Sequence, residues 1–130
     1  MRHRVSADRP WAKVVGYSRA VGVGNIIEVS GTAAAGPDGD IMAPGDVEGQ
    51  AREALRIIGE ALRELGASYR DVVRTRVLMA DASRWEEAGR AHGEVFRDIR
   101  PATIVVGVGG FVDPAILVEI EATAILEESG

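Results

Sequence analysis

Two amphipathic segments that alternate with strand-like segments constrain the fold of this chain more than any other sequence feature. Between Asp46 and Gly66, apolar residues recur at steps of three and four, which is the period of one helix face. Asp46 can accept the free N–H groups of the first turn, and Gly66 suits the position after the last turn. The second segment begins at the capping-box pattern Ser83-Arg84-Trp85-Glu86 and ends before Pro101. The sequence therefore predicts two helices separated by a strand.

The second predicted helix carries glycine in its interior. Its inner stripe is expected to consist of Trp85, Ala88, His92, Val95 and Phe96. Gly89 and Gly93 lie in the same helix, where each costs about 1 kcal/mol relative to alanine. A close approach of another backbone segment would account for that cost.

Strand-like runs surround the two helices. The pair Gly24-Asn25 tolerates the positive φ of a tight hairpin turn, and the run Gly36-Pro37-Asp38-Gly39 is a second turn signal. The predicted strands cover residues 14–23, 26–30, 40–42, 72–80, 104–108 and 116–126. One face of the strand over 72–80 is expected to carry Val73, Thr75, Val77 and Met79. Residues 1–12 are expected to form an irregular lead-in.

This order of elements predicts an α+β fold in which two helices cover one face of a mixed sheet, as a single domain over residues 1–130. The helices leave the other sheet face uncovered. That face is expected to carry apolar residues of the last strand, namely Val118, Ile120, Ala122 and Ala124 or their neighbours. A large exposed apolar face in a monomer favours burial between subunits.

Composition excludes several classes of site. The chain of 130 residues has no cysteine, which excludes disulfides, cysteine nucleophiles and thiolate metal sites. Its two histidines are His3 and His92, so one subunit cannot build a multi-histidine metal site. The net charge of −5 disfavours nucleic acid as a partner. No stretch is typical of a membrane span or a signal peptide, so we expect a soluble, cytoplasmic protein with no membrane partner.

Two glutamates stand out as candidates for chemistry. Glu119 and Glu121 are two residues apart on the last predicted strand, so both side chains project from the same face. Such a carboxylate can act as an acid or base when a neighbour or burial raises its pKa. The alternative is a cross-strand ion pair with Arg74 or Arg76, which also share a face.

Four other side chains have both a functional and a structural interpretation. His92, on an apolar helix stripe, is either a hydrogen-bonded core residue or a base. Tyr17 either donates a hydrogen bond in a pocket or packs its ring. Arg19 and Arg100 are either carboxylate anchors or solvated surface residues.

Several short matches, in order and with consistent spacing, point to one family. They are Tyr17-Ser18, Val29-Ser30-Gly31, Gly66-Ala67-Ser68, Asp71-Val72-Val73, Phe96, Pro101-Ala102 and Leu117-Val118-Glu119-Ile120-Glu121-Ala122. With these residues the chain resembles the RidA/YjgF family from about Tyr17 to Ala124. The resemblance implies a chorismate-mutase-like fold and a homotrimer whose sheets form a central barrel. It also implies a small-molecule cleft at each subunit interface, where archetypal members hydrolyse amino-acid-derived imines and enamines without metal or cofactor.

The resemblance assigns roles to individual positions. It implies that Glu119 positions the attacking water and that Tyr17, Ser30 and Gly31 line the cleft. Thr103 stands where the archetype has the arginine that binds the substrate carboxylate, so the chain resembles an arginine-lacking branch. Losing this charge-assisted contact predicts weak activity on 2-iminobutanoate.

Further departures in the same pattern are Thr32 in place of a common glutamine, Gly89 in place of asparagine, and His92 in place of an aromatic residue. Arg19 or Arg100 is therefore a candidate to supply the missing positive charge from another direction, and His92 is a further candidate ligand contact.

Three functions fit these residues. The first is hydrolysis of an imine, an enamine or a related small molecule, with Glu119 guiding water. The second is a metabolite-binding or regulatory trimer without turnover. The third, endoribonuclease or translation-inhibitor activity, is disfavoured by the acidic charge and the 5% aromatic content, because RNA binding uses basic grooves and stacking platforms.

Overall fold

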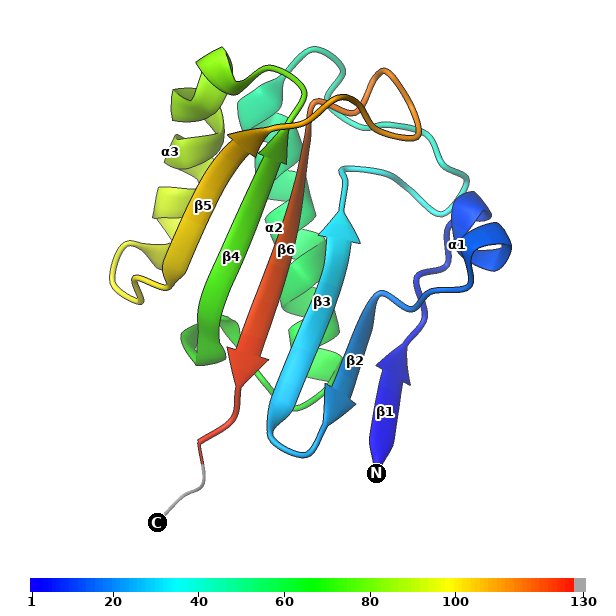
Figure 1. The fold of residues 1–130 in the computed structure, drawn as a ribbon, viewed down its shortest axis with the longest axis vertical. Helices are drawn as coiled ribbons and strands as arrows, with labels where there is room; N and C mark the ends of the chain where they lie inside the picture. The colour runs from blue at the N-terminus through cyan, green and yellow to red at the C-terminus, as the bar shows by residue number, and fades with distance from the viewer. Residues whose placement is uncertain (128–130) are drawn as a thin grey trace.

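The computed structural model describes residues 1–127 and shows a six-stranded sheet with both long helices on one side (Figure 1). The strands are β1 (Arg2–Val5), β2 (Ala20–Val23), β3 (Ile26–Thr32), β4 (Val72–Met79), β5 (Ala102–Gly107) and β6 (Val118–Ile125). The helices are α1 (Pro10–Val15), α2 (Val47–Glu64) and α3 (Trp85–Phe96), and single 3-10 turns cover Tyr69–Asp71 and Ala82–Arg84. Among residues 1–127, no helix combines the length and the apolar composition that a membrane span requires.

The sheet has the order β1-β2-β3-β6-β4-β5. All neighbours are antiparallel except β4 and β5, which are parallel and connected through α3. The α+β fold with a mixed sheet and two helices on one face is therefore confirmed. In the sheet, β6, the last strand of the chain, lies between β3 and β4, so the glutamates of β6 lie in the middle of the sheet.

The long helix α2 follows its sequence signals. The Asp46 carboxylate accepts a hydrogen bond from the Gly49 N–H at 2.8 Å, and Gly66 adopts φ +80° just beyond the helix end. The predicted apolar stripe faces the sheet and is buried with residues such as Leu55, Ile58 and Leu62. Local period and capping therefore account for α2, and the hairpin at Gly24-Asn25 also forms as predicted.

The N-terminal prediction is wrong. Residues 1–12, expected to be irregular, contain β1 and the start of α1, and the strand predicted over 14–23 begins only at Ala20. Pro10 occupies the first turn of α1, where its fixed φ suits a helix, and Gly16 at φ +85° ends that helix. The polar β1 forms because its backbone pairs with β2, from Arg2 opposite Val23 to Val5 opposite Ala20.

Four local predictions also need correction. A register shift between Val72 and Arg74 separates Val73 from the face of Thr75, Val77 and Met79 that it was expected to share, and Val73 is 44% exposed. Asp81, not Ser83, caps the turn before α3, because its carboxylate accepts the Ser83 N–H at 3.0 Å. Trp85, expected on the inner stripe, opens α3 and is 54% exposed. The strand predicted over 40–42 is reduced to one bridge between Ala35 and Ile41.

The two faces of β6 differ sharply. The sequence placed Val118, Ile120, Ala122 and Ala124 on the uncovered face, and that prediction is wrong, because all four are buried on the helix side. Their neighbours on the uncovered face are largely polar. We call this uncovered side the open face of the sheet. Its exposed apolar residues are Val23, Ile26, Ile104 and Ile125, each at least 36% exposed.

Candidate functional site

Glu119 projects from β6 onto the open face, because its neighbours Val118 and Ile120 face the helices. The side chain is half-buried, and this burial raises the pKa of the Glu119 carboxyl, whereas the nearby Arg19 opposes the rise. Within residues 1–127, Glu119 forms no ion pair. A desolvated carboxyl with a raised pKa is suited to proton transfer.

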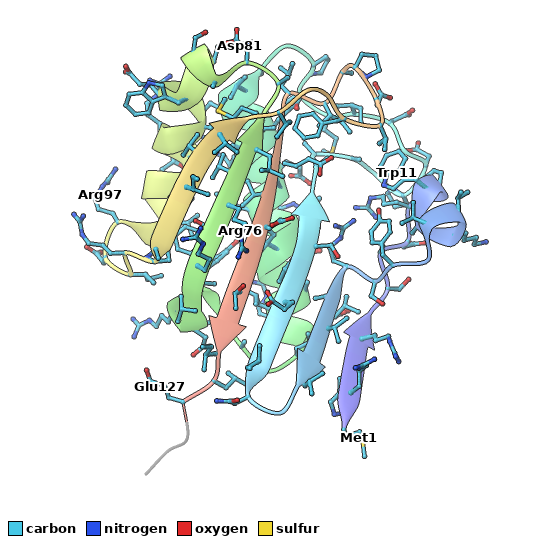
Figure 2. The ribbon with its side chains drawn as sticks, in the orientation of Figure 1. Met1, Trp11, Arg76, Asp81, Arg97 and Glu127 are labelled. Atoms are coloured by element: carbon cyan, nitrogen blue, oxygen red, sulfur yellow. The ribbon has the colours of Figure 1, made fainter. Side chains whose placement is uncertain are left out.

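Glu121, by contrast, has a partner. Its carboxylate lies 3.7 Å from the Arg76 guanidinium, directly across the β4–β6 pair. Arg76 lies over the middle of the open face (Figure 2). The cross-strand ion pair that the sequence left open is thus confirmed for Glu121, whereas Glu119 has none among the residues that the structure describes.

Arg19 is buried beside this carboxyl. It is 6% exposed, and its Nη1 donates to the Gly31 carbonyl and to Thr32 Oγ1, both at 3.1 Å. Its guanidinium carbon lies 6.0 Å from the centre of the Tyr17 ring. Burial lowers the pKa of Arg19, and the neighbouring Tyr17 and Glu119 oppose this change. The structure therefore brings Tyr17, Arg19 and Glu119 together.

A bulge in β3 shapes the surface next to Glu119. Val29 pairs with Ala122, and Thr32 pairs with Ile120. Ser30 and Gly31 therefore both lie opposite Glu121, the single residue of β6 between these partners. The Ser30 hydroxyl donates to the Ser18 carbonyl at 2.6 Å. A Cβ atom at Gly31 would lie 2.8 Å from Glu119 Oε1, so only glycine leaves that carboxyl in place. We call Tyr17, Arg19, Ser30, Gly31 and Glu119 the acidic group.

Gly31→Ala tests this close approach. The added methyl group is expected to push the Glu119 side chain aside, which its flexible end permits without unfolding the chain. A displacement of 1 Å can cost about 100-fold in rate, so we expect turnover to fall roughly ten-fold for a smaller shift. Steady-state kinetics measure the change, and thermal unfolding of the same variant should stay near that of the wild type. An unchanged rate would contradict the close contact.

Thr103 lies in a second group of residues. Its Oγ1 lies 2.7 Å from Thr75 Oγ1 on β4, and Thr75 Oγ1 lies 2.8 Å from His92 Nε2 on α3. Thr103 can also donate to the Pro101 carbonyl at 3.2 Å. Thr75 is fully buried. Burial lowers the pKa of His92, and its ring packs 4.7 Å from the Phe96 ring, so the imidazole is neutral at neutral pH.

Arg100 lies near this second group. Its backbone adopts φ +56°, unusual for a residue with a side chain, while its N–H donates to the Phe96 carbonyl at 2.8 Å. It lines a cavity of about 330 Å³ together with His92, Gly93, Phe96, Arg97 and Pro101. Figure 2 shows Arg97 beyond the edge of the sheet. We call Thr75, His92, Arg100 and Thr103 the threonine group.

The two groups lie on opposite faces of one chain. Thr103 contacts Thr75, which faces the helices, whereas Glu119 projects onto the open face. Neither Arg19 nor Arg100 therefore sits beside both Thr103 and Glu119. A single small molecule cannot contact both groups of the same chain.

Thr75 is a residue that the sequence did not single out. It was expected to share a face of its strand with Val77 and Met79, and all three are buried. A hydroxyl at such a position needs a hydrogen-bond partner, which was the available signal. The partners themselves depend on the parallel register of Thr75 with Thr103, which only the fold reveals.

Comparisons with known proteins agree with this architecture. Residues 7–126 match the model of the family described as Endoribonuclease L-PSP. An uncharacterised Streptomyces coelicolor protein is 38% identical over 93% of this chain and 90% of its own length. A mouse 2-iminobutanoate/2-iminopropanoate deaminase is 31% identical over 96% of this chain and 92% of its own length.

Solved structures give the same result. A Mycobacterium tuberculosis member of the YjgF/YER057c/UK114 family superposes with a TM-score of 0.86 at 43% identity, covering 97% of this chain and 100% of that one. The Escherichia coli YjgF gene product superposes with a TM-score of 0.82 at 26% identity, covering 96% and 99%. The fold, the matched residues and these relatives together establish that the chain belongs to the RidA/YjgF family.

Proposed function

We propose that this protein is a RidA-like hydrolase of an imine, an enamine or a related small molecule, and that Glu119 is its general base. The observation that carries the proposal is the half-buried, unpaired Glu119 carboxyl with a raised pKa next to Gly31. Glu119 takes a proton from water as the oxygen adds to the C=N carbon. Glu119 returns that proton to the nitrogen, the hydroxyl of the adduct passes its own proton to the nitrogen as the C=O bond forms, the C–N bond breaks, and the products are a carbonyl compound and ammonia.

The reacting site is proposed to form between subunits of a homotrimer. The acidic group and the threonine group lie on opposite faces of one chain, so one subunit supplies Glu119 and its neighbour supplies Thr103. The exposed apolar residues of the open face support contact with another copy. Tyr17, Ser30 and Gly31 line the cleft from the side of Glu119, and His92 and Arg100 line it from the side of Thr103.

Thr103 argues against the substrate for which the mouse relative is named. An uncharged hydroxyl cannot replace the bidentate contact between an arginine and a carboxylate. Arg19 is held by the Gly31 carbonyl and Thr32, and within residues 1–127 the exposed Arg100 side chain makes no hydrogen bond to Thr103. We therefore expect slow turnover of 2-iminobutanoate. An RNA substrate is disfavoured by the net charge of −5.

Ammonia release from enzymatically generated 2-iminobutanoate and 2-aminoacrylate tests this function. We expect slow release by the wild type and release at least ten-fold faster by Thr103→Arg, because the arginine restores the carboxylate contact. Thr103→Ser, which keeps a hydroxyl, is the matched control and should stay slow. Wild-type turnover as fast as that of an archetypal relative would contradict the role of Thr103. Absence of ammonia release by the wild type and by both variants would favour a metabolite-binding trimer without turnover.

Light scattering tests the proposed assembly. At micromolar concentration we expect a particle of three times the chain mass of 13.8 kDa. A particle with the mass of one chain would contradict a cleft built from two subunits.

A further inference from the structure

Three side chains in the threonine group form a continuous hydrogen-bond chain. It runs from His92 Nε2 through Thr75 Oγ1 to Thr103 Oγ1, with contacts of 2.8 and 2.7 Å. Thr75, the central member, is fully buried and cannot exchange these partners for water. The arrangement of protons in this chain therefore decides which kind of hydrogen bond Thr103 can offer to a ligand.

The hydrogen-bond chain has two possible proton arrangements, because a neutral imidazole carries one N–H. If the proton is on Nε2, His92 donates to Thr75, Thr75 donates to Thr103, and Thr103 donates to the Pro101 carbonyl. If it is on Nδ1, Thr103 donates to Thr75, and Thr75 donates to His92 Nε2. In both arrangements the hydroxyl proton of Thr103 is already used within the protein. The lone pairs of Thr103 Oγ1 are therefore what remains available to bind a ligand.

We propose that this hydrogen-bond chain makes Thr103 Oγ1 an acceptor, so that the site selects a ligand with a neutral N–H donor, such as a primary carboxamide, in place of a carboxylate. A carboxylate offers only lone pairs and would face those of Thr103. A carboxamide N–H donates to the same oxygen. The inference rests on the proposed function for the position of the cleft and names the substrate class: an imine or enamine next to a carboxamide.

Two arginines near the hydrogen-bond chain of His92, Thr75 and Thr103 do not reverse this selection. Arg97 and Arg100 line the adjacent cavity, but both side chains are exposed and neither is hydrogen-bonded to Thr103. Water and salt screen exposed charges, so direct contact at Thr103 decides between the two ligands. His92 is the titratable group in contact with the chain, and it is neutral.

Calorimetric binding of a matched ligand pair tests the inference without requiring turnover. The pair is 2-oxobutanamide and 2-oxobutanoate, which differ only in the carboxamide or carboxylate. We expect the wild type to bind the amide at least ten-fold more tightly and Thr103→Arg to prefer the carboxylate. In Thr75→Val, Thr103 loses its buried partner and keeps only the longer, exposed contact to the Pro101 carbonyl at 3.2 Å, from which a carboxylate can draw its proton, so the preference should fall below three-fold. Thr123→Val, on the open face, is the matched control and should keep the wild-type preference.

Several outcomes would overturn the inference. They are equal binding of the two ligands by the wild type, tighter binding of the carboxylate, binding of neither, or an unchanged preference in Thr75→Val. The wild-type measurement decides even if Thr75→Val does not fold. Amide preference without any ammonia release would support the inference and contradict the hydrolase. Glu119-dependent hydrolysis of a carboxylate imine without amide preference would do the opposite.

Discussion

Glu119→Gln is expected to lower the rate of ammonia release at least 100-fold on any imine that the wild type hydrolyses. The amide keeps the size of the side chain but cannot take a proton from water, and general base catalysis contributes about 100-fold to 10,000-fold. Glu121→Gln is the matched control, since it lies two residues away on the same face of β6 and pairs with Arg76. Its rate should stay within about three-fold of the wild type, as the loss of one exposed ion pair changes little.

Equal losses in the two variants would mean that the charge of the open face matters and that proton transfer at Glu119 does not. Measurement of kcat and KM separately makes the distinction. Loss of the base lowers kcat, whereas weaker ligand binding raises KM.

The same carboxyl predicts a dependence on pH. Burial raises the pKa of Glu119 above its ordinary value of 4.5, so the base is lost as pH falls through the raised value and kcat/KM should fall with it. In the folded state this carboxyl holds its proton more tightly than in the unfolded state. Its contribution to stability is therefore fully present below pH 4.5 and is lost as pH rises through the raised pKa.

It follows that Glu119→Gln, although expected to release ammonia at least 100-fold more slowly, should have a larger free energy of unfolding than the wild type at pH 7. The difference should shrink as pH falls towards 4.5. Urea unfolding at both pH values and at one protein concentration measures it, because the proposed assembly would make stability depend on concentration.

Elements specified by local signals were predictable, whereas those specified by distant pairing were not. α2 forms between Asp46 and Gly66 because capping and apolar period agree. β1 forms because its backbone pairs with the free edge of β2, and no pattern in residues 2–5 predicts this pairing. Val73 shows how far a local irregularity can mislead, since one shifted residue turned it from the buried face to solvent.

The same distinction between local signals and distant pairing applies to the candidate site. The period of β6 placed Glu119 and Glu121 on one face, but only the strand register shows that Arg76 lies opposite Glu121 and leaves Glu119 unpaired. The parallel register of β4 and β5 likewise joins Thr75 to Thr103. Sequence spacing reports the direction of a side chain within its own strand. Its partners across the sheet depend on pairing between segments that are far apart in the chain.

Glycines inside the two long helices give a second strong prediction, in which the same substitution has opposite effects. A Cβ atom at Gly59 in α2 would lie 2.7 Å from Tyr69 Cζ, so Tyr69 must move. Tyr69 donates to the Leu55 carbonyl at 2.6 Å and packs edge-on against Phe96 with 5.8 Å between ring centres. In α3, a Cβ atom at Gly89 would meet only Trp85 Cε3, at an ordinary 3.8 Å. No backbone segment within residues 1–127 closely approaches Gly89.

Gly59→Ala is therefore expected to lower the free energy of unfolding by about 2 kcal/mol. Overpacking and the loss of the Tyr69 contacts outweigh the roughly 1 kcal/mol that alanine adds to a helix. Gly89→Ala is expected to gain about 1 kcal/mol, because only the helix preference changes. Urea unfolding of both variants at equal concentration measures the two signs. In a Tyr69→Ala background, where the ring no longer blocks the position, Gly59→Ala should become stabilising. A loss that persists there would show that Tyr69 is not what requires glycine at position 59.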